Sequence, residues 1–254
     1  MRQSFSYTLL ITSLFLVWNC KVQYVQSSFE YRNSIVSDSI MAVDSQLLQV
    51  YLPYKQIIDE DMSRVISVSA QEMVKNKPES NLTNFLGDLL LEQGEKVMIK
   101  MEKDIKPDIS YFNYGGIRTS LPKGEITVGK IFELMPFENE LVFIQISGSR
   151  IQEFLNAVAE SGGESVGGVR FKISNKKAKD IEIGGSPLQP DSFYWLVTND
   201  YVAAGGDRRE MLTHRKEFID SGEKIRDVII EYMETKYQSG QEIVKEKDGR
   251  IAYE

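Results

Sequence analysis

Polar side chains flank a glycine pair in the stretch YFNYGGIRTSLPKG, residues 111–124. Asn113 supplies an amide and Arg118 a planar cationic fork, on either side of Gly115 and Gly116. A glycine pair permits positive φ, or lets a ligand or a second backbone approach closely. The stretch is therefore either a ligand-binding turn or a tight corner between two elements, and the residues themselves favour the corner.

Residues that could carry out catalysis are few. The chain has one histidine, His214, whereas hydrolytic metal sites need several His, Asp or Glu ligands. No P-loop, nucleophile elbow or GxGxxG pattern occurs. The glycine-rich segment 162–168 lacks a Lys-Ser/Thr ending and is interpreted as a turn. We therefore predict no catalytic residue and no metal site in this chain.

The elements that must position these residues alternate irregularly between helix and strand. This order predicts one α/β domain of α+β layered type, in which helices flank a mixed sheet. The patterns predict helices over 47–66, 82–101, 127–134 and 223–237, a helix from 149 that Gly162-Gly163 stops, and strands over 108–112, 141–147, 169–174, 180–185 and 193–202.

The N-terminus predicts export. An apolar run from Tyr7 to Trp18 follows Arg2, and its length is typical of a signal-peptide core. Cys20, the only cysteine, comes directly after it and is the expected lipidation residue of a bacterial lipoprotein; a plain export signal is the alternative. We expect a signal peptide over 1–20, a tether over 21–45 and the domain over 46–254, in the periplasm or at the cell surface.

Composition excludes one class of partner. The 254 residues are 42% hydrophobic and 26% charged, which is ordinary for a globular protein, and the net charge is −7. No basic run is interleaved with aromatic residues, so nucleic acid is not an expected partner.

Four stretches, taken together, resemble a known family. In order, they are PESNLTNFLGDLL (78–90), NYGGIRTSLPKGEITVGKIFELMPFENELV (113–142), SGSRIQEFL (147–155) and VTNDYVAAGGDRREM (197–211). They are similar to the C-terminal, substrate-recognition domain of the 5′-nucleotidase family. The resemblance covers about residues 46–254, without the metallophosphatase domain that normally precedes it in this family.

The resemblance implies a nucleotide site. Phe137 and Tyr201 match the two aromatics that sandwich the base, and Asp207 matches the acid that binds ribose hydroxyls. Arg118 matches the arginine on the ribose-phosphate side. Asn113 and Asn139 match amides that orient the ligand, and Gly115 and Gly116 let the backbone pass close beneath it. Without the resemblance, the aromatics could be core residues, and Asp207 could simply pair with Arg118.

The sequence departs from the family pattern at two places. Lys75 and Lys77 stand where an arginine is usual, and Arg208 follows Asp207 where glycine is usual. The first departure weakens any assignment of a phosphate contact. The second changes the expected rim of the pocket.

The resemblance implies a function shared between two chains. This chain would bind nucleoside monophosphates for dephosphorylation in nucleotide catabolism, and a separate metallophosphatase chain would supply divalent metals. No cofactor is expected in this chain itself. The alternative is a non-catalytic surface lipoprotein that binds nucleosides or nucleotides.

Overall fold

The computed structural model describes Asn33 and residues 44–254. The chain divides into two units between Gln49 and Val50, and the larger unit comprises Val50–Glu254. The predicted signal peptide, Cys20 and most of the predicted tether lie outside the described residues. The predicted domain boundary at residue 46 therefore stays a prediction.

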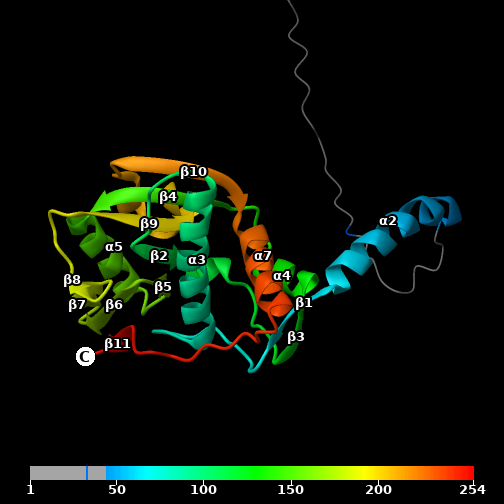
Figure 1. The fold of residues 1–254 in the computed structure, drawn as a ribbon, viewed down its shortest axis with the longest axis horizontal. Helices are drawn as coiled ribbons and strands as arrows, with labels where there is room; N and C mark the ends of the chain where they lie inside the picture. Colours follow the sequence, from blue (N-terminus) through cyan, green and yellow to red (C-terminus); the bar gives the residue numbers. More distant parts are fainter. Residues whose placement is uncertain (1–32, 34–43) are drawn as a thin grey trace, which may run out of the picture. The chain divides into compact units, whose positions relative to one another are not determined.

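Helices and strands alternate along the chain, and they form mixed sheets with flanking helices (Figure 1). The predicted α/β layered fold class is confirmed. The helices are α2 (Ser45–Ser63), α3 (Asn81–Lys100), α4 (Val128–Leu134), α5 (Gly148–Glu160), α6 (Asp200–Ala203) and α7 (Ile225–Gln238), with short 3₁₀ turns at Tyr114–Gly116, Gly206–Arg208 and Glu210–Thr213.

A five-stranded sheet forms the centre of the larger unit, in the order β10-β4-β9-β2-β5. Its strands are β2 (Ile109–Phe112), β4 (Glu140–Ser147), β5 (Ser165–Gly167), β9 (Phe193–Asn199) and β10 (Glu217–Lys224). β2 and β9 are parallel, and the other neighbours are antiparallel. The smaller sheets pair β1 (Val65–Ser69) with β3 (Gly124–Thr127), and β11 (Ile251–Tyr253), β6 (Val169–Ser174), β7 (Lys177–Ile183) and β8 (Ser186–Pro187) in that order.

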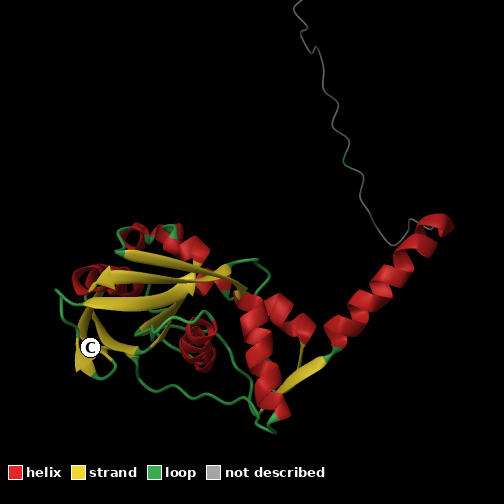
Figure 2. Ribbon diagram, turned by 45° about the horizontal axis from the view of Figure 1, so that its top comes forward, coloured by secondary structure: helices red, strands yellow, loops and turns green. Residues whose placement is uncertain are grey.

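Both faces of strand β4 are largely buried, which explains why it is apolar almost throughout. Leu141 and Phe143 point into a core with α3, α4 and α7, whereas Val142 and Ile144 point into a second core with α5, β6 and β7. Figure 2 shows helices on both sides of these strands. The sheet is thus held rigidly, and the loops at its ends can carry a site.

Several predicted elements need correction. The first helix ends at Ser63 instead of 66, because the following residues pair with β3 as strand β1. The segment 162–168, interpreted as a turn, contains β5, a buried strand of three residues that pairs antiparallel with β2. The strand predicted over 193–202 ends at Asn199, and the next residues form α6. The strands β1, β3, β8, β10 and β11 were not predicted, since they are short or at sheet edges.

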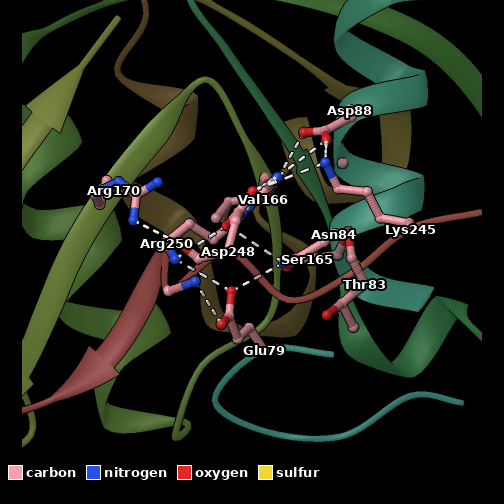
Figure 3. Close-up of polar contacts among 12 residues, drawn as sticks. Glu79, Thr83, Asn84, Asp88, Ser165, Val166, Arg170, Lys245, Asp248 and Arg250 are labelled. Atoms are coloured by element: carbon pink, nitrogen blue, oxygen red, sulfur yellow. Dashed lines mark hydrogen bonds and ion pairs between the residues drawn. The ribbon is translucent and has the colours of Figure 1, made fainter. Parts of the chain in front are cut away.

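A polar cluster attaches the C-terminal segment to α3 (Figure 3). We call Glu79, Asp88, Asp248 and Arg250 the Arg250 cluster. The Arg250 guanidinium bonds both oxygens of Asp88, at 2.6 and 3.0 Å, and both oxygens of Asp248, at 3.0 and 2.5 Å. Glu79 accepts hydrogen bonds from the backbone amides of Gly249 and Arg250. Every charged group in the cluster is therefore satisfied within the protein.

Within the part of the chain that the structure describes, no helix is long and apolar enough to span a membrane.

Candidate functional site

All eight predicted binding residues line one cavity of about 650 Å³, although they come from four separate segments of the chain. They lie at the ends of β2, α4, β9 and α6. The lining comprises Asn113, Gly115, Gly116, Arg118, Phe137, Asn139, Tyr201 and Asp207, together with Glu138, which was not predicted. The volume is in the range of small-molecule sites in proteins.

The glycine pair forms a 3₁₀ turn directly after β2. Neither glycine has positive φ, so the pair is not required for a left-handed backbone. A Cβ on Gly116 would lie 2.8 Å from both the Asn113 amide oxygen and the Phe112 ring, which is too close. A Cβ on Gly115 would lie 3.7 Å from an Asp207 carboxylate oxygen, on the cavity side. Close packing fixes Gly116, whereas Gly115 leaves space beside Asp207.

Asp207 is held from two sides. Its Oδ2 accepts a hydrogen bond from Asn113 Nδ2 at 2.7 Å, and its Oδ1 accepts one from the Tyr201 hydroxyl at 3.0 Å. Asn199 Nδ2 donates to Asn113 Oδ1 at 3.0 Å, so both ends of the buried Asn113 amide are engaged within the protein. Asn113 thus orients Asp207, while each carboxylate oxygen keeps a further lone pair for a ligand hydroxyl.

The two aromatics are not core residues. Phe137 is 46% exposed and Tyr201 is 49% exposed, and both border the cavity. Tyr201 lies on α6, and its ring covers Gly206, where a Cβ would approach ring carbons to 2.5 Å. Half-exposed rings beside a cavity can stack on a planar ligand, because the ring faces retain large apolar area that a ligand can cover.

Arg118 and Asn139 are also bonded within the protein. Arg118 is exposed, and its Nη1 donates to the Gly115 carbonyl at 3.2 Å; it forms no salt bridge with Asp207. Asn139 Nδ2 donates to Asp200 Oδ1 at 2.8 Å. The alternative in which Arg118 merely pairs with Asp207 is therefore wrong, and the guanidinium keeps donors for an anionic ligand.

Two lysines stand close to the glycine turn. Lys75 Nζ donates to the Tyr114 and Ile117 carbonyls, and both Lys75 and Lys77 lie over the Tyr114 ring. Burial, together with the nearby charges of Arg118 and Lys77, lowers the pKa of Lys75. These lysines add positive potential near the cavity, but neither side chain lines it.

Some residues around the cavity were missed in the sequence analysis. Glu138 follows Phe137, and hydrogen bonding to Arg226 lowers the pKa of its carboxyl group. Asn199 caps α6 by accepting from the Val202 amide at 2.7 Å, in addition to its bond with Asn113. A polar residue at the end of an apolar strand was the available signal, because caps occur where helices begin.

Among residues 33 and 44–254, no group of three or more His, Cys, Asp and Glu side chains is placed to hold a metal ion.

The fold and the cavity define an α/β domain that presents two half-exposed aromatics, a fixed carboxylate and an arginine to one small-molecule-sized pocket. The sequence model of the 5′-nucleotidase C-terminal domain matches residues 59–214, so the chain belongs to this family.

Relatives and solved structures agree with this assignment. The chain is 28% identical over 202 residues to the 5′-nucleotidase of Vibrio vulnificus, and this match covers 78% of this chain and 35% of that protein. It is 30% identical to the trifunctional nucleotide phosphoesterase protein YfkN of Bacillus subtilis, over 71% of this chain and 13% of that protein. The structure of a 5′-nucleotidase precursor from Thermus thermophilus matches with a TM-score of 0.68 and 28% identity, over 81% of this chain and 42% of that one.

The chain thus corresponds to about a third of the Vibrio relative and less than half of the Thermus chain.

Proposed function

We propose that this chain is the nucleotide-recognition domain of a 5′-nucleotidase-type hydrolase that binds nucleoside monophosphates. One observation carries the proposal: a single cavity is lined by two half-exposed aromatics, a carboxylate held in place by Asn113, and an arginine. A stacked base, a ribose and a phosphate match these three kinds of group.

Each side chain has a distinct task in this proposal. Phe137 and Tyr201 stack on the base, and a base–aromatic stack contributes about 1–3 kcal/mol per base. Asp207 accepts hydrogen bonds from the ribose hydroxyls, and Asn113 keeps its carboxylate in position. Arg118 donates to the ribose-phosphate side, while Gly115 leaves room for the sugar. Asn139, tied to Asp200, orients the wall beside Phe137.

Dephosphorylation requires chemistry beyond these residues. Divalent metals on a separate metallophosphatase chain would activate water and stabilise the charge of the departing phosphate. This chain supplies recognition: it binds and orients the nucleotide so that its phosphate is presented to that second chain. We further propose export to the periplasm or cell surface with a lipid anchor on Cys20, on the basis of the N-terminal sequence alone.

The competing function is capture of nucleosides or nucleotides by a non-catalytic lipoprotein. It is motivated by the missing metal-ligand clusters among residues 44–254. The two functions differ in whether a catalytic chain associates with this one.

Assays of AMP binding and AMP hydrolysis distinguish the two proposed functions. The purified protein with added Mn²⁺ or Zn²⁺ is expected to bind AMP without hydrolysing it; turnover at an enzyme-like rate would overturn the split between two chains. The immobilised protein, after exposure to an extract of its source cells, is expected to retain metal-dependent AMP hydrolysis. Binding of AMP without any retained activity would favour the non-catalytic lipoprotein.

A further inference from the structure

A buried ion pair adjoins residues that line the cavity, because Glu164 and Arg209 border a neighbouring pocket that shares Gly115 and Asp207 with it. Arg209 Nη2 donates to Glu164 Oε1 at 2.6 Å, and the two side chains are only 6% and 7% exposed. Neither residue lines the cavity that contains Phe137 and Tyr201. We propose that Arg209 and Glu164 are positioning residues, which fix Asp207 and the glycine turn in the geometry that binds ribose. This inference rests on the proposed function.

Glu164 joins two loops of the site through one carboxylate. Its Oε2 accepts from the Tyr111 hydroxyl at 2.5 Å and from the Tyr114 amide at 3.0 Å, at the start of the glycine turn. Its Oε1 accepts from Ser161 at 2.8 Å in addition to Arg209. The glycine turn and the segment after Gly206 are therefore tied to the same two oxygen atoms.

Arg209 is bonded on two of its nitrogens. Its Nε donates to the Tyr111 hydroxyl at 3.3 Å, beside the Nη2 bond to Glu164. Burial alone would lower the pKa of Arg209, but the nearby Tyr111 and Glu164 oxygens overcome this and raise it. Burial, and then the Glu164 carboxylate, raise the pKa of Tyr111 well above its usual value. The arginine thus stays charged and the tyrosine stays protonated over the physiological range.

The backbone directly before Arg209 has an unfavourable conformation that surrounding contacts must stabilise. Asp207 and Arg208 have φ of 53° and 59°, so two consecutive non-glycine residues are left-handed. That conformation is unfavourable for L-residues and persists only where surrounding contacts impose it. Asp207 is held on the cavity side by Asn113 and Tyr201, and the chain is held on the interior side by Arg209. Release of Arg209 would let Asp207 relax away from the ribose position.

A core requirement alone does not explain this pair. Burial of two charges is costly, and apolar residues of similar volume often stabilise a protein as well or better. The pair lies between the segment of Asp207 and the glycine turn. This position explains the pair, because the two side chains hold Asp207 and the turn in a fixed geometry. A positioning role predicts an effect confined to ligands that use Asp207.

The test compares adenosine with 2′,3′-dideoxyadenosine, which lacks the 2′ and 3′ hydroxyls and keeps the 5′ hydroxyl. Affinities are measured by calorimetry on the wild-type protein and on Arg209→Met, Arg209→Lys and Glu164→Gln. Arg250→Met is the matched control, because it removes a buried arginine of the Arg250 cluster, whose residues do not line the cavity. Near-ultraviolet circular dichroism establishes that each variant is folded.

Loss of a charge-assisted contact corresponds to about a tenfold to hundredfold loss of affinity. Arg209→Met and Glu164→Gln are expected to lower the affinity for adenosine by at least about tenfold and the affinity for dideoxyadenosine by less than about twofold. Arg209→Lys is expected to recover part of the loss, and Arg250→Met to leave the ratio of the two affinities unchanged. If Arg209→Met does not fold, the lysine and glutamine variants decide the question.

An unchanged ratio in the folded Arg209 and Glu164 variants would overturn the inference while leaving the proposed function intact. Equal weakening of both ligands, matched by Arg250→Met, would overturn it too, because that pattern reflects general destabilisation. Absence of adenosine binding by the wild-type protein would instead overturn the proposed function, and this inference with it.

Discussion

Two polar clusters of this domain connect distant chain segments. They differ in the cavity that each borders and in whether their carboxylates remain available to a ligand. The pocket cluster, which consists of Asn113, Tyr201 and Asp207, borders a cavity of about 650 Å³ with aromatic side chains in its wall. The Arg250 cluster borders a cavity of about 310 Å³ whose lining contains no aromatic residue.

The carboxylates of the two clusters are satisfied differently. In the Arg250 cluster, Asp88 and Asp248 each accept two hydrogen bonds from a different edge of the Arg250 guanidinium, and Lys245 adds a further salt bridge to Asp88. In the pocket cluster, Asp207 accepts only neutral donors and faces the cavity. A carboxylate neutralised by cations stabilises structure, whereas one held by neutral donors beside aromatics is available to a ligand.

The largest expected effect comes from a substitution that disrupts the Arg250 cluster. Arg250→Met removes the guanidinium that bonds Asp88 and Asp248 through two nitrogens each, and leaves Lys245 as the cation beside both carboxylates. We expect a loss of roughly 2–3 kcal/mol in the free energy of unfolding, below the value for a fully buried pair because both aspartates are more than a third exposed. Denaturant titration measures it. A change in adenosine affinity of the folded variant would contradict the separation of the two clusters.

A smaller effect is expected at the pocket, with the opposite signature. Asp207→Asn keeps the size of the side chain but replaces a charged acceptor with an amide. We expect about a tenfold to hundredfold loss of adenosine affinity, from one lost charge-assisted hydrogen bond. The free energy of unfolding, measured by denaturant titration, is expected to stay within about 0.5 kcal/mol of the wild-type value, because Asp207 is exposed. Unchanged affinity would remove Asp207 from the site.

Acid should destabilise the Arg250 cluster. Hydrogen bonding to Arg250 lowers the pKa of Asp248 below its ordinary value, against the opposing effect of burial. A carboxyl group with a lowered folded-state pKa stabilises the protein above its unfolded-state pKa of about 4, and this stability is lost as pH falls through the folded-state pKa. Unfolding free energies measured from pH 6 down to pH 2 should therefore fall less steeply in Asp248→Asn. Parallel curves for the two proteins would contradict this assignment.

The smallest expected effect concerns a single hydroxyl. Tyr201→Phe keeps the stacking ring but removes the bonds that its hydroxyl makes with the Asp207 carboxylate and amide. We expect a loss of adenosine affinity of about twofold to tenfold, as for one neutral hydrogen bond. Dideoxyadenosine, titrated in parallel, should bind the variant and the wild type equally. Equal weakening of both ligands would mean that the hydroxyl supports the ring instead of Asp207.

Much of the site could be predicted because its residues sit in short, ordered motifs. Asn113, Gly115 and Gly116 precede Arg118 on one turn, and local sequence therefore places them together. That Phe137, Tyr201 and Asp207 join them in one cavity follows from the pairing of β4, β9 and β2, which no local pattern specifies. The family resemblance supplied this long-range information.

The unpredicted features depend on three-dimensional partners. Glu164 and Arg209 are 45 positions apart in the sequence and read as ordinary charged loop residues, so their burial could not be foreseen. The segment 162–168 was interpreted as a turn because it is rich in glycine and lacks a Lys-Ser/Thr ending. Gly167 instead lies in β5 against Gly87 of α3, where a Cβ would come within 2.6 Å of backbone. Edge strand β10 was missed because its half-exposed residues lack a clean alternation.

The most direct test of the account is a calorimetric titration of adenosine and AMP into the purified protein, with Phe137→Ala and Tyr201→Ala alongside. Each ring is about half exposed, so its removal should leave folding intact while the base loses one stacking surface. The account predicts binding by the wild type, with each alanine variant weakened by roughly fivefold to more than a hundredfold, as expected for a loss of 1–3 kcal/mol. Wild-type affinity in both variants, or no binding by the wild type, would contradict the assignment of this cavity to a nucleotide.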